Sequence, residues 1–137
     1  MCFVFNEGEI MLDEDKEAVE EVIEEAYIKG VHGDQDLRRV KCGFHDEFAM
    51  LVLNNNNIDK VNVDEWLNRI AEMKRKNPEL WKSKTSYDFR IIDITGNAAV
   101  AKLNVYKGTT HFSTDYMLLH KFDEGWKIVS KIFAIPQ

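Results

Sequence analysis

Residues 106–133, YKGTTHFSTDYMLLHKFDEGWKIVSKIF, contain two long and mostly apolar stretches joined by an acidic turn. The pattern predicts strands over residues 111–122 and 126–135, with the turn at residues 123–125. A turn this short joins strands that run antiparallel. Two such strands, at the end of a chain that begins with helices, favour a curved sheet wrapped around a helix-covered cavity.

These two strands are apolar on both faces, so each face of the sheet needs a cover. One face is expected to pack beneath the helices. A homodimer formed through the outer sheet face is the simplest cover for the other, and we expect one.

The preceding segments, residues 84–94 and 98–106, predict another antiparallel pair, because Gly96-Asn97 is a favourable two-residue hairpin turn. Small side chains at Ala99 and Ala101 leave room for a covering helix. Alternation along residues 84–94 predicts two faces, with Tyr87, Phe89 and Ile91 on one and Ile92 and Ile94 on the other.

The N-terminal part of the chain is predicted to be mainly helical. Apolar residues at helical spacing predict three helices, over residues 13–29, 34–42 and 62–77. Gly30 and Gly33 are interpreted as the end of the first helix. Four consecutive asparagines, residues 54–57, predict the turn of a short hairpin between the second and third helices.

Charge is unevenly distributed along the 137 residues, whose formal net charge is -6. Residues 1–29 hold ten acidic and two basic side chains, whereas the rest of the chain holds fourteen acidic and sixteen basic ones. Neither part carries a basic stripe interleaved with aromatic residues. The composition therefore disfavours nucleic-acid binding, and the acidic side chains are interpreted as a solvated helix face.

The length is that of one domain, and we expect a flexible extension over residues 1–12 followed by a single domain over residues 13–137. No apolar run approaches the roughly 20 residues of a membrane-spanning helix, so no membrane partner is expected. The first residues lack the basic and long apolar segments of a signal peptide. We therefore expect a cytoplasmic protein.

Several short segments together resemble one known family. They are YIKG at residues 27–30, Phe44-His45, ITGNAAVA at 94–101, DYMLL at 115–119 and WKIVSKIF at 126–133. In this order, within residues 13–134, they resemble the putative lumazine-binding, SnoaL-like family of the nuclear transport factor 2-like (NTF2-like, or ketosteroid isomerase-like) superfamily. The family follows Phe-His with Pro and then an acid, whereas here Asp46 replaces that Pro and Glu47 holds the acidic place.

The resemblance implies an α+β fold, in which three N-terminal helices pack on a strongly curved, mostly antiparallel sheet that encloses a cavity. It also implies a small ligand in that cavity, apolar or heteroaromatic, and no cofactor. Fold similarity does not fix chemistry, so the site has to be argued from its residues.

Two side chains are candidates for a general base. His45 follows an aromatic residue at a helix-to-strand junction, where it either contacts a ligand or bonds to the backbone and fixes the junction. Asp115 is an acid in an apolar strand, so it is either a base with an altered pKa or a structural partner of a backbone N–H or of Arg90. Tyr116 lies on the opposite face from Asp115 by strand alternation, which argues against a Tyr/Asp pair in one pocket.

The other predicted pocket residues are Glu47, Trp66, Ile70, Tyr116 and Trp126. Trp66 and Ile70 belong to the apolar stripe of the helix expected to cover the cavity, where Trp66 either stacks on a flat ligand or fills the core. Trp126 opens the last strand and is expected either to contact the ligand or to close the end of the sheet. His32 is interpreted as a loop residue. The four histidines and two cysteines show no metal-binding spacing, so no metal is expected.

Two functions from different classes stay open. The first, which the sequence favours, is a non-catalytic protein that binds a small apolar or aromatic molecule in a cone-shaped cavity. The second is a metal-independent isomerase, dehydratase or cyclase of the SnoaL or ketosteroid isomerase type, with His45 or Asp115 as general base. A third interpretation, an interaction subunit whose sheet face binds another protein, is less favoured.

Overall fold

The computed structural model describes residues 12–136. The chain begins with helix α1, Leu12–Val22, which continues without a break into η1, Ile23–Asp34, a helical segment with the wider π-type turn. The predicted flexible extension, residues 1–12, lies outside the described residues except for Leu12, which already belongs to α1. No helix among residues 12–136 is long and apolar enough to cross a membrane.

The first helical segment runs past both glycines that were predicted to end it. A Cβ atom on Gly30 would lie only 2.9 Å from Cγ2 of Val40, so this glycine serves close packing between η1 and α2. The helix ends instead at Gln35, which is left-handed and whose amide donates to the Gly30 carbonyl at 2.8 Å. The prediction of a stop at Gly30 is therefore wrong.

The remaining helices are α2 (Leu37–Gly43), α3 (Val63–Lys76) and a short, unpredicted α4 (Pro78–Lys82). Asp36 caps α2, where its carboxylate accepts from the Arg38 and Arg39 amides at 2.9 and 3.3 Å. The cap thus lies two residues later than Asp34, the predicted start. Asn62 caps α3 as predicted, accepting from the Glu65 amide at 2.9 Å.

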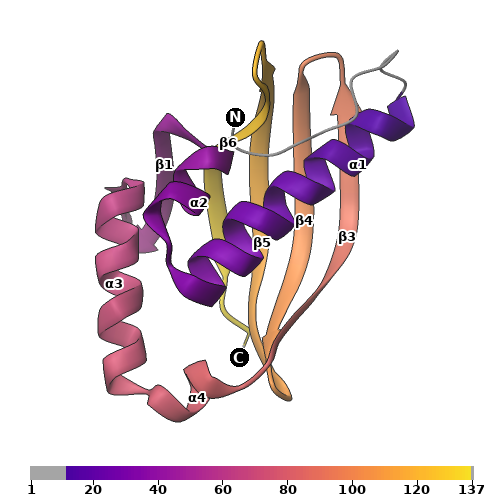
Figure 1. The fold of residues 1–137 in the computed structure, drawn as a ribbon. Helices are drawn as coiled ribbons and strands as arrows, with labels where there is room; N and C mark the ends of the chain where they lie inside the picture. The colour runs from indigo at the N-terminus through magenta and orange to yellow at the C-terminus, as the bar shows by residue number, and fades with distance from the viewer. Residues whose placement is uncertain (1–11, 137) are drawn as a thin grey trace.

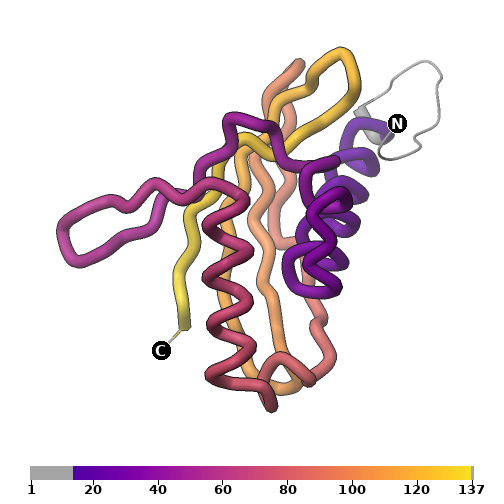
Figure 2. Tube along the Cα trace, turned by 60° about the vertical axis from the view of Figure 1, so that its left-hand side comes forward, coloured from indigo at the N-terminus to yellow at the C-terminus, as the bar shows by residue number. Residues whose placement is uncertain are grey.

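Six strands form one curved sheet in the order β2-β1-β6-β5-β4-β3. Their bounds are β1 Phe44–Asn54, β2 Asn57–Val61, β3 Thr85–Thr95, β4 Ala98–Lys107, β5 Thr110–Phe122 and β6 Gly125–Ala134. Neighbouring strands are antiparallel except β1 and β6, which run parallel. The helices lie on one side of this sheet (Figures 1 and 2), and the β1–β2 hairpin projects away from it (Figure 2). This is the predicted α+β cone.

Two irregularities decide which side chains of the long strands face the helices. On β3 the register shifts between Phe89 and Ile91, so Ile92 packs against the core while Ile91 is 52% exposed. The predicted faces of β3 are thus wrong beyond Phe89. On β6 the extra residue is Val129, because Leu118 pairs with Ser130 and Leu119 pairs with Ile128. As a result Ile128 and Lys131 both point inwards, although they are three residues apart.

Candidate functional site

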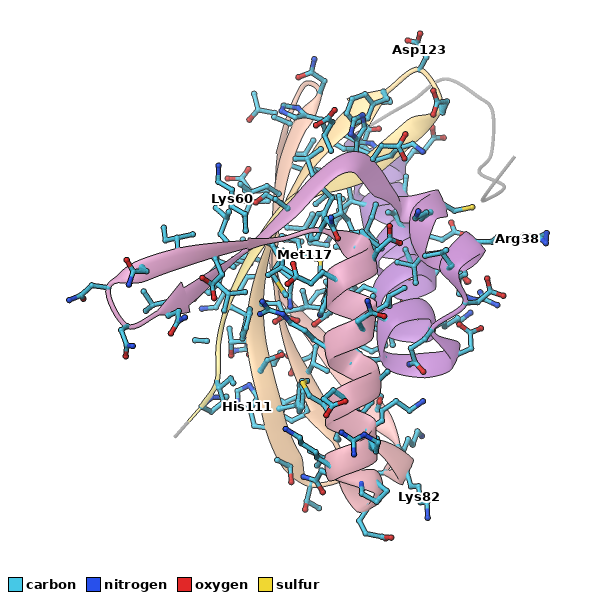
Figure 3. The ribbon with its side chains drawn as sticks, turned by 90° about the vertical axis from the view of Figure 1, so that its left-hand side faces the viewer. Arg38, Lys60, Lys82, His111, Met117 and Asp123 are labelled. Carbon is cyan, nitrogen blue, oxygen red and sulfur yellow. The ribbon has the colours of Figure 1, made fainter. Side chains whose placement is uncertain are left out.

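A cavity of about 180 Å³ lies between η1, α3 and the inner face of the sheet. Figure 3 views this region from the side of α3, with side chains occupying the space between the helix and the strands. Most of the wall is apolar, and its main members are Met50, Trp66, Ile70, Phe112 and Phe133. The exposed side chains Arg69, Met73 and Ile135 also line the cavity and mark its opening to solvent.

The polar part of the site is centred on Asp115, a fully buried carboxylate on the inner face of β5. The Tyr27 hydroxyl, from η1, donates a short hydrogen bond to Oδ2 of Asp115. The Lys131 ammonium, from β6, lies 3.5 Å from Oδ1. Burial raises the pKa of Tyr27 well above its usual value, and the charge and hydrogen bond of Asp115 raise it further. Tyr27 is therefore neutral at physiological pH.

Lys131 is surrounded by aromatic rings. Its Nζ atom lies 4.6 Å from the ring centre of Phe133, 4.7 Å from that of Trp66 and 5.0 Å from that of Tyr27. It also approaches Sδ of Met50 at 3.9 Å. Burial lowers the pKa of Lys131, and the neighbouring Asp115 works against that change. The ammonium is thus held by three aromatic rings, one ion pair and a thioether sulfur, and it lines the cavity.

His32 lies in the cavity wall, and its placement corrects the prediction of a loop residue. The side chain belongs to η1, is 6% exposed and stacks on Trp81 at 5.7 Å, with the Tyr27 ring edge-on at 4.7 Å. Neither ring nitrogen has a hydrogen-bond partner among residues 12–136. Burial lowers the pKa of His32 well below its usual value, and the charges of Lys107 and Lys131 lower it further. The imidazole is therefore neutral.

A second buried lysine adds positive charge beside this wall. Lys107, at the end of β4, is 1% exposed, and its Nζ atom lies 3.9 Å from the ring centre of Trp81. It donates to the Thr85 hydroxyl at 3.1 Å. Burial lowers its pKa to about 8, with a smaller contribution from Lys74. No acidic side chain of residues 12–136 forms an ion pair with it.

Three of the seven predicted pocket residues lie at or beside the cavity. Trp66 and Ile70 line it, both from the apolar stripe of α3. Asp115 lies directly behind its wall, bonded to Tyr27 and paired with Lys131. Arg90, one of the partners suggested for Asp115, instead faces Asp88 at 3.8 Å.

The other four predicted pocket residues lie elsewhere. His45 accepts from the Glu47 amide at 3.0 Å and stacks on Phe122, away from the cavity, and Glu47 itself is exposed. Tyr116 lies on the outer sheet face, opposite Asp115 as alternation predicts. Trp126 is buried, and its indole nitrogen donates to Asp15 of α1 at 3.0 Å, which ties the first helix to the end of the sheet.

Four polar residues of the site were not predicted from the sequence. They are His32, Ser113, Lys131 and Tyr27, of which Tyr27 was predicted only as part of a helix and not as the partner of Asp115. Ser113 shares the inward face of β5 with Asp115, so alternation contained the signal for it. His32 and Lys131 carried no such signal, because a π-type helix and a β-bulge place them inside. Among residues 12–136, no group of three or more His, Cys, Asp or Glu side chains is arranged to hold a metal ion.

The helices pack on one side of a curved six-stranded sheet, with a cavity between the two layers. This is the NTF2-like fold. The family model described as "Putative lumazine-binding" matches residues 14–134, and the chain belongs to that family. A search of curated proteins gave no match.

Solved structures of low sequence identity share the fold. An NTF2-like protein of unknown function from Silicibacter pomeroyi is 12% identical with a TM-score of 0.74, covering 93% of this chain and 100% of that chain. One from Shewanella baltica is 20% identical with a TM-score of 0.73, covering 93% and 98%. A putative aromatic ring hydroxylase from Novosphingobium aromaticivorans is 13% identical with a TM-score of 0.61, covering 93% of each chain. At these identities the likeness establishes the fold alone.

Proposed function

We propose that the protein binds a small, flat, mostly apolar or heteroaromatic molecule in the cavity between α3 and the sheet. The observation that carries the proposal is an apolar cavity of about 180 Å³ with the unpartnered His32 imidazole in its wall. Buried polar groups without partners are rare in native proteins, and a ligand supplies the missing ones. The family description, putative lumazine-binding, is consistent with a heteroaromatic ligand.

The size and lining of the cavity narrow the ligand class. An apolar cavity of roughly 150 Å³ is known to accept a single benzene ring, so about 180 Å³ suits one or two fused rings. Trp66 and Phe133 contribute aromatic surface to the cavity wall, against which a planar ligand would pack. Side chains extending from the ring system would leave through the opening near Arg69 and Met73.

A thermal-shift screen against flavins, pteridines, steroids and polyketide-like acids tests the proposal. A ligand at 100 times its dissociation constant adds roughly 2.7 kcal/mol of stability. The variant Ile70→Phe fills the cavity and is expected to abolish the shift. The matched control, Ala71→Phe, adds the same ring to an exposed position of the same helix and is expected to keep it. A shift that survives in Ile70→Phe would place the ligand outside the cavity.

A second candidate function is a metal-independent isomerase, dehydratase or cyclase. The observation that favours it is the fully buried Asp115 between Tyr27 and Lys131, beside a cavity able to hold a substrate. The base would be Asp115, whereas His45, the other base suggested by the sequence, lies away from this cavity. Any turnover found for a screened ligand is to be compared in Asp115→Asn and His45→Ala variants. Unchanged rates in both would remove this candidate.

A further inference from the structure

We propose that the cavity selects aromatic acids, with the anionic oxygen of the ligand bound by Lys131, His32 and Ser113. This inference rests on the proposed function and names the ligand class. All three side chains line the same cavity. Each is at most 6% exposed, so water reaches them only through the cavity.

Most hydrogen-bonding groups of these three residues are donors that have no acceptor among residues 12–136. Within the part of the chain that the structure describes, the Lys131 ammonium makes no N–H···O hydrogen bond within the usual range of about 2.7–3.2 Å, since its carboxylate partner lies 3.5 Å away and its other polar contact is the Met50 sulfur at 3.9 Å. The Ser113 hydroxyl and both nitrogens of His32 are unpartnered among the described residues. A neutral imidazole offers one N–H donor, so three donors converge on one cavity. Three donors suit a carboxylate, a phenolate or an enolate better than an amine.

The buried charges also favour a monoanion. Asp115 balances the charge of Lys131, whereas the ammonium of Lys107 has no carboxylate partner among residues 12–136. The Lys107 ammonium lies over the Trp81 ring, and His32 of the cavity wall stacks on that same ring. The unbalanced charge of Lys107 therefore lies next to the cavity wall. Buried charges without partners are costly, and a ligand with one negative charge would neutralise this excess.

The aromatic part of the cavity wall lies beside the proposed binding groups for the acid, which limits how far the ligand's ring can be from its acidic group. The ring centres of Trp66 and Phe133 lie 4.6–4.7 Å from Nζ of Lys131, so the ammonium adjoins the aromatic wall against which a ligand ring would pack. A ring packed against these side chains therefore brings its substituent to the ammonium. The geometry thus favours a carboxylate attached directly to the ring over one on a long chain.

Titration calorimetry with matched probes tests the inference on the wild-type protein at pH 7.5. The probes are benzoate and benzamide for one ring, and 2-naphthoate and 2-naphthamide for two. Each pair has nearly the same shape and differs in charge. We expect the carboxylate to bind about tenfold more tightly than the amide in at least one pair, as for a charge-assisted hydrogen bond. Equal binding of acid and amide would overturn the inference and leave the proposed function intact. No binding by any of the four probes would count against both.

Two variants assign the preference to its residues. The double substitution Lys131→Met with Asp115→Asn removes one positive and one negative charge together, so the net charge of the interior does not change, and it is expected to abolish the preference for the acid. The matched control is Lys102→Met, which removes a lysine lying over Tyr116 on the outer face. His32→Leu, with His120→Leu as control, gives a second test, in which the preference falls severalfold. A preference that survives both interior changes would overturn the inference.

Discussion

At the scale of single residues, the pair of Lys131 and Asp115 places opposite charges 3.5 Å apart, with side-chain exposures of 5% and 0%. Removing one partner of a buried pair leaves an uncompensated charge, which costs about 3–5 kcal/mol. We expect Lys131→Met alone to lower the free energy of unfolding by about 3 kcal/mol, and the double variant with Asp115→Asn to recover most of that loss. Urea unfolding of the single and double variants measures the coupling.

An ion pair with an exposed partner, on the same sheet, provides the control for this comparison of single and double variants. Lys127 and Glu124 lie 3.5 Å apart, but the Glu124 side chain is 75% exposed. Glu124→Gln is expected to change stability by less than about 1 kcal/mol. A double-mutant coupling near zero between positions 131 and 115 would show that the two charges are independent.

Lys107 gives a prediction about pH. Its pKa is about 8 in the folded state against 10.5 for the free side chain, so the unfolded chain binds more protons between these values. Stability from this residue therefore rises as pH increases from 8 towards 10.5. The difference in unfolding free energy between wild type and Lys107→Met, measured from pH 7.5 to 9.5, is expected to shift in favour of wild type as pH rises. A difference that is constant with pH would contradict the shifted pKa.

Residue-scale prediction from the sequence worked where periodicity is regular. Trp66 and Ile70 follow the helical stripe of α3, and the buried face of β4 that holds Ala99 and Ala101 continues without interruption to Lys107. His45 was singled out by its neighbours in sequence, but its Nδ1 atom bonds the local backbone. Its assignment to the site, like those of the other pocket residues, stays a prediction until a ligand is bound.

At the scale of elements, η1 and α2 approach each other closely at Gly30. A Cβ atom there would lie 2.9 Å from Val40, whereas one on Gly33 would meet nothing nearer than the Ile28 carbonyl at 3.4 Å. We expect Gly30→Ala to destabilise the protein by about 1–3 kcal/mol through overpacking, and Gly33→Ala to change stability far less. Thermal unfolding measures both. Val40→Ala is expected to rescue Gly30→Ala, and a failure to rescue would point to a cause other than this contact.

The order of elements was predictable because caps, turns and apolar periods are local signals. Asn62, the asparagines at 54–57 and Gly96-Asn97 all lie where the chain turns or a helix begins. The departures have nonlocal causes. Gly30 packs closely against Val40, ten residues away, instead of ending the helix, and the bulges of β3 and β6 are defined by the register of their partner strands.

At the scale of the whole molecule, the outer sheet face carries exposed apolar side chains at Ile91, Tyr116, Leu118 and Ile132. The homodimer expected from the sequence would cover them, and it stays a prediction. Size-exclusion chromatography with light scattering is expected to give twice the chain mass of 16.0 kDa. Leu118→Asp is expected to produce monomers, whereas Leu53→Asp, at an exposed position on β1 near the hairpin turn, is expected to leave dimers intact. A wild-type protein that runs as a monomer would refute the dimer. The cytoplasmic location also stays a prediction.

The bulge at Val129 has a consequence for comparing relatives of this chain. Regular pairing of all residues of β6, without the bulge, would exchange the inside and outside of the strand after Ile128, so that Ser130 and Ile132 would point inwards in place of Lys131. The charge of the interior thus depends on the register of the strand as much as on the identity of its residues. At 12–20% identity, an alignment that misplaces this one residue equates core positions with surface positions. Relatives are therefore best matched here by their backbone register before any of their interior residues are compared.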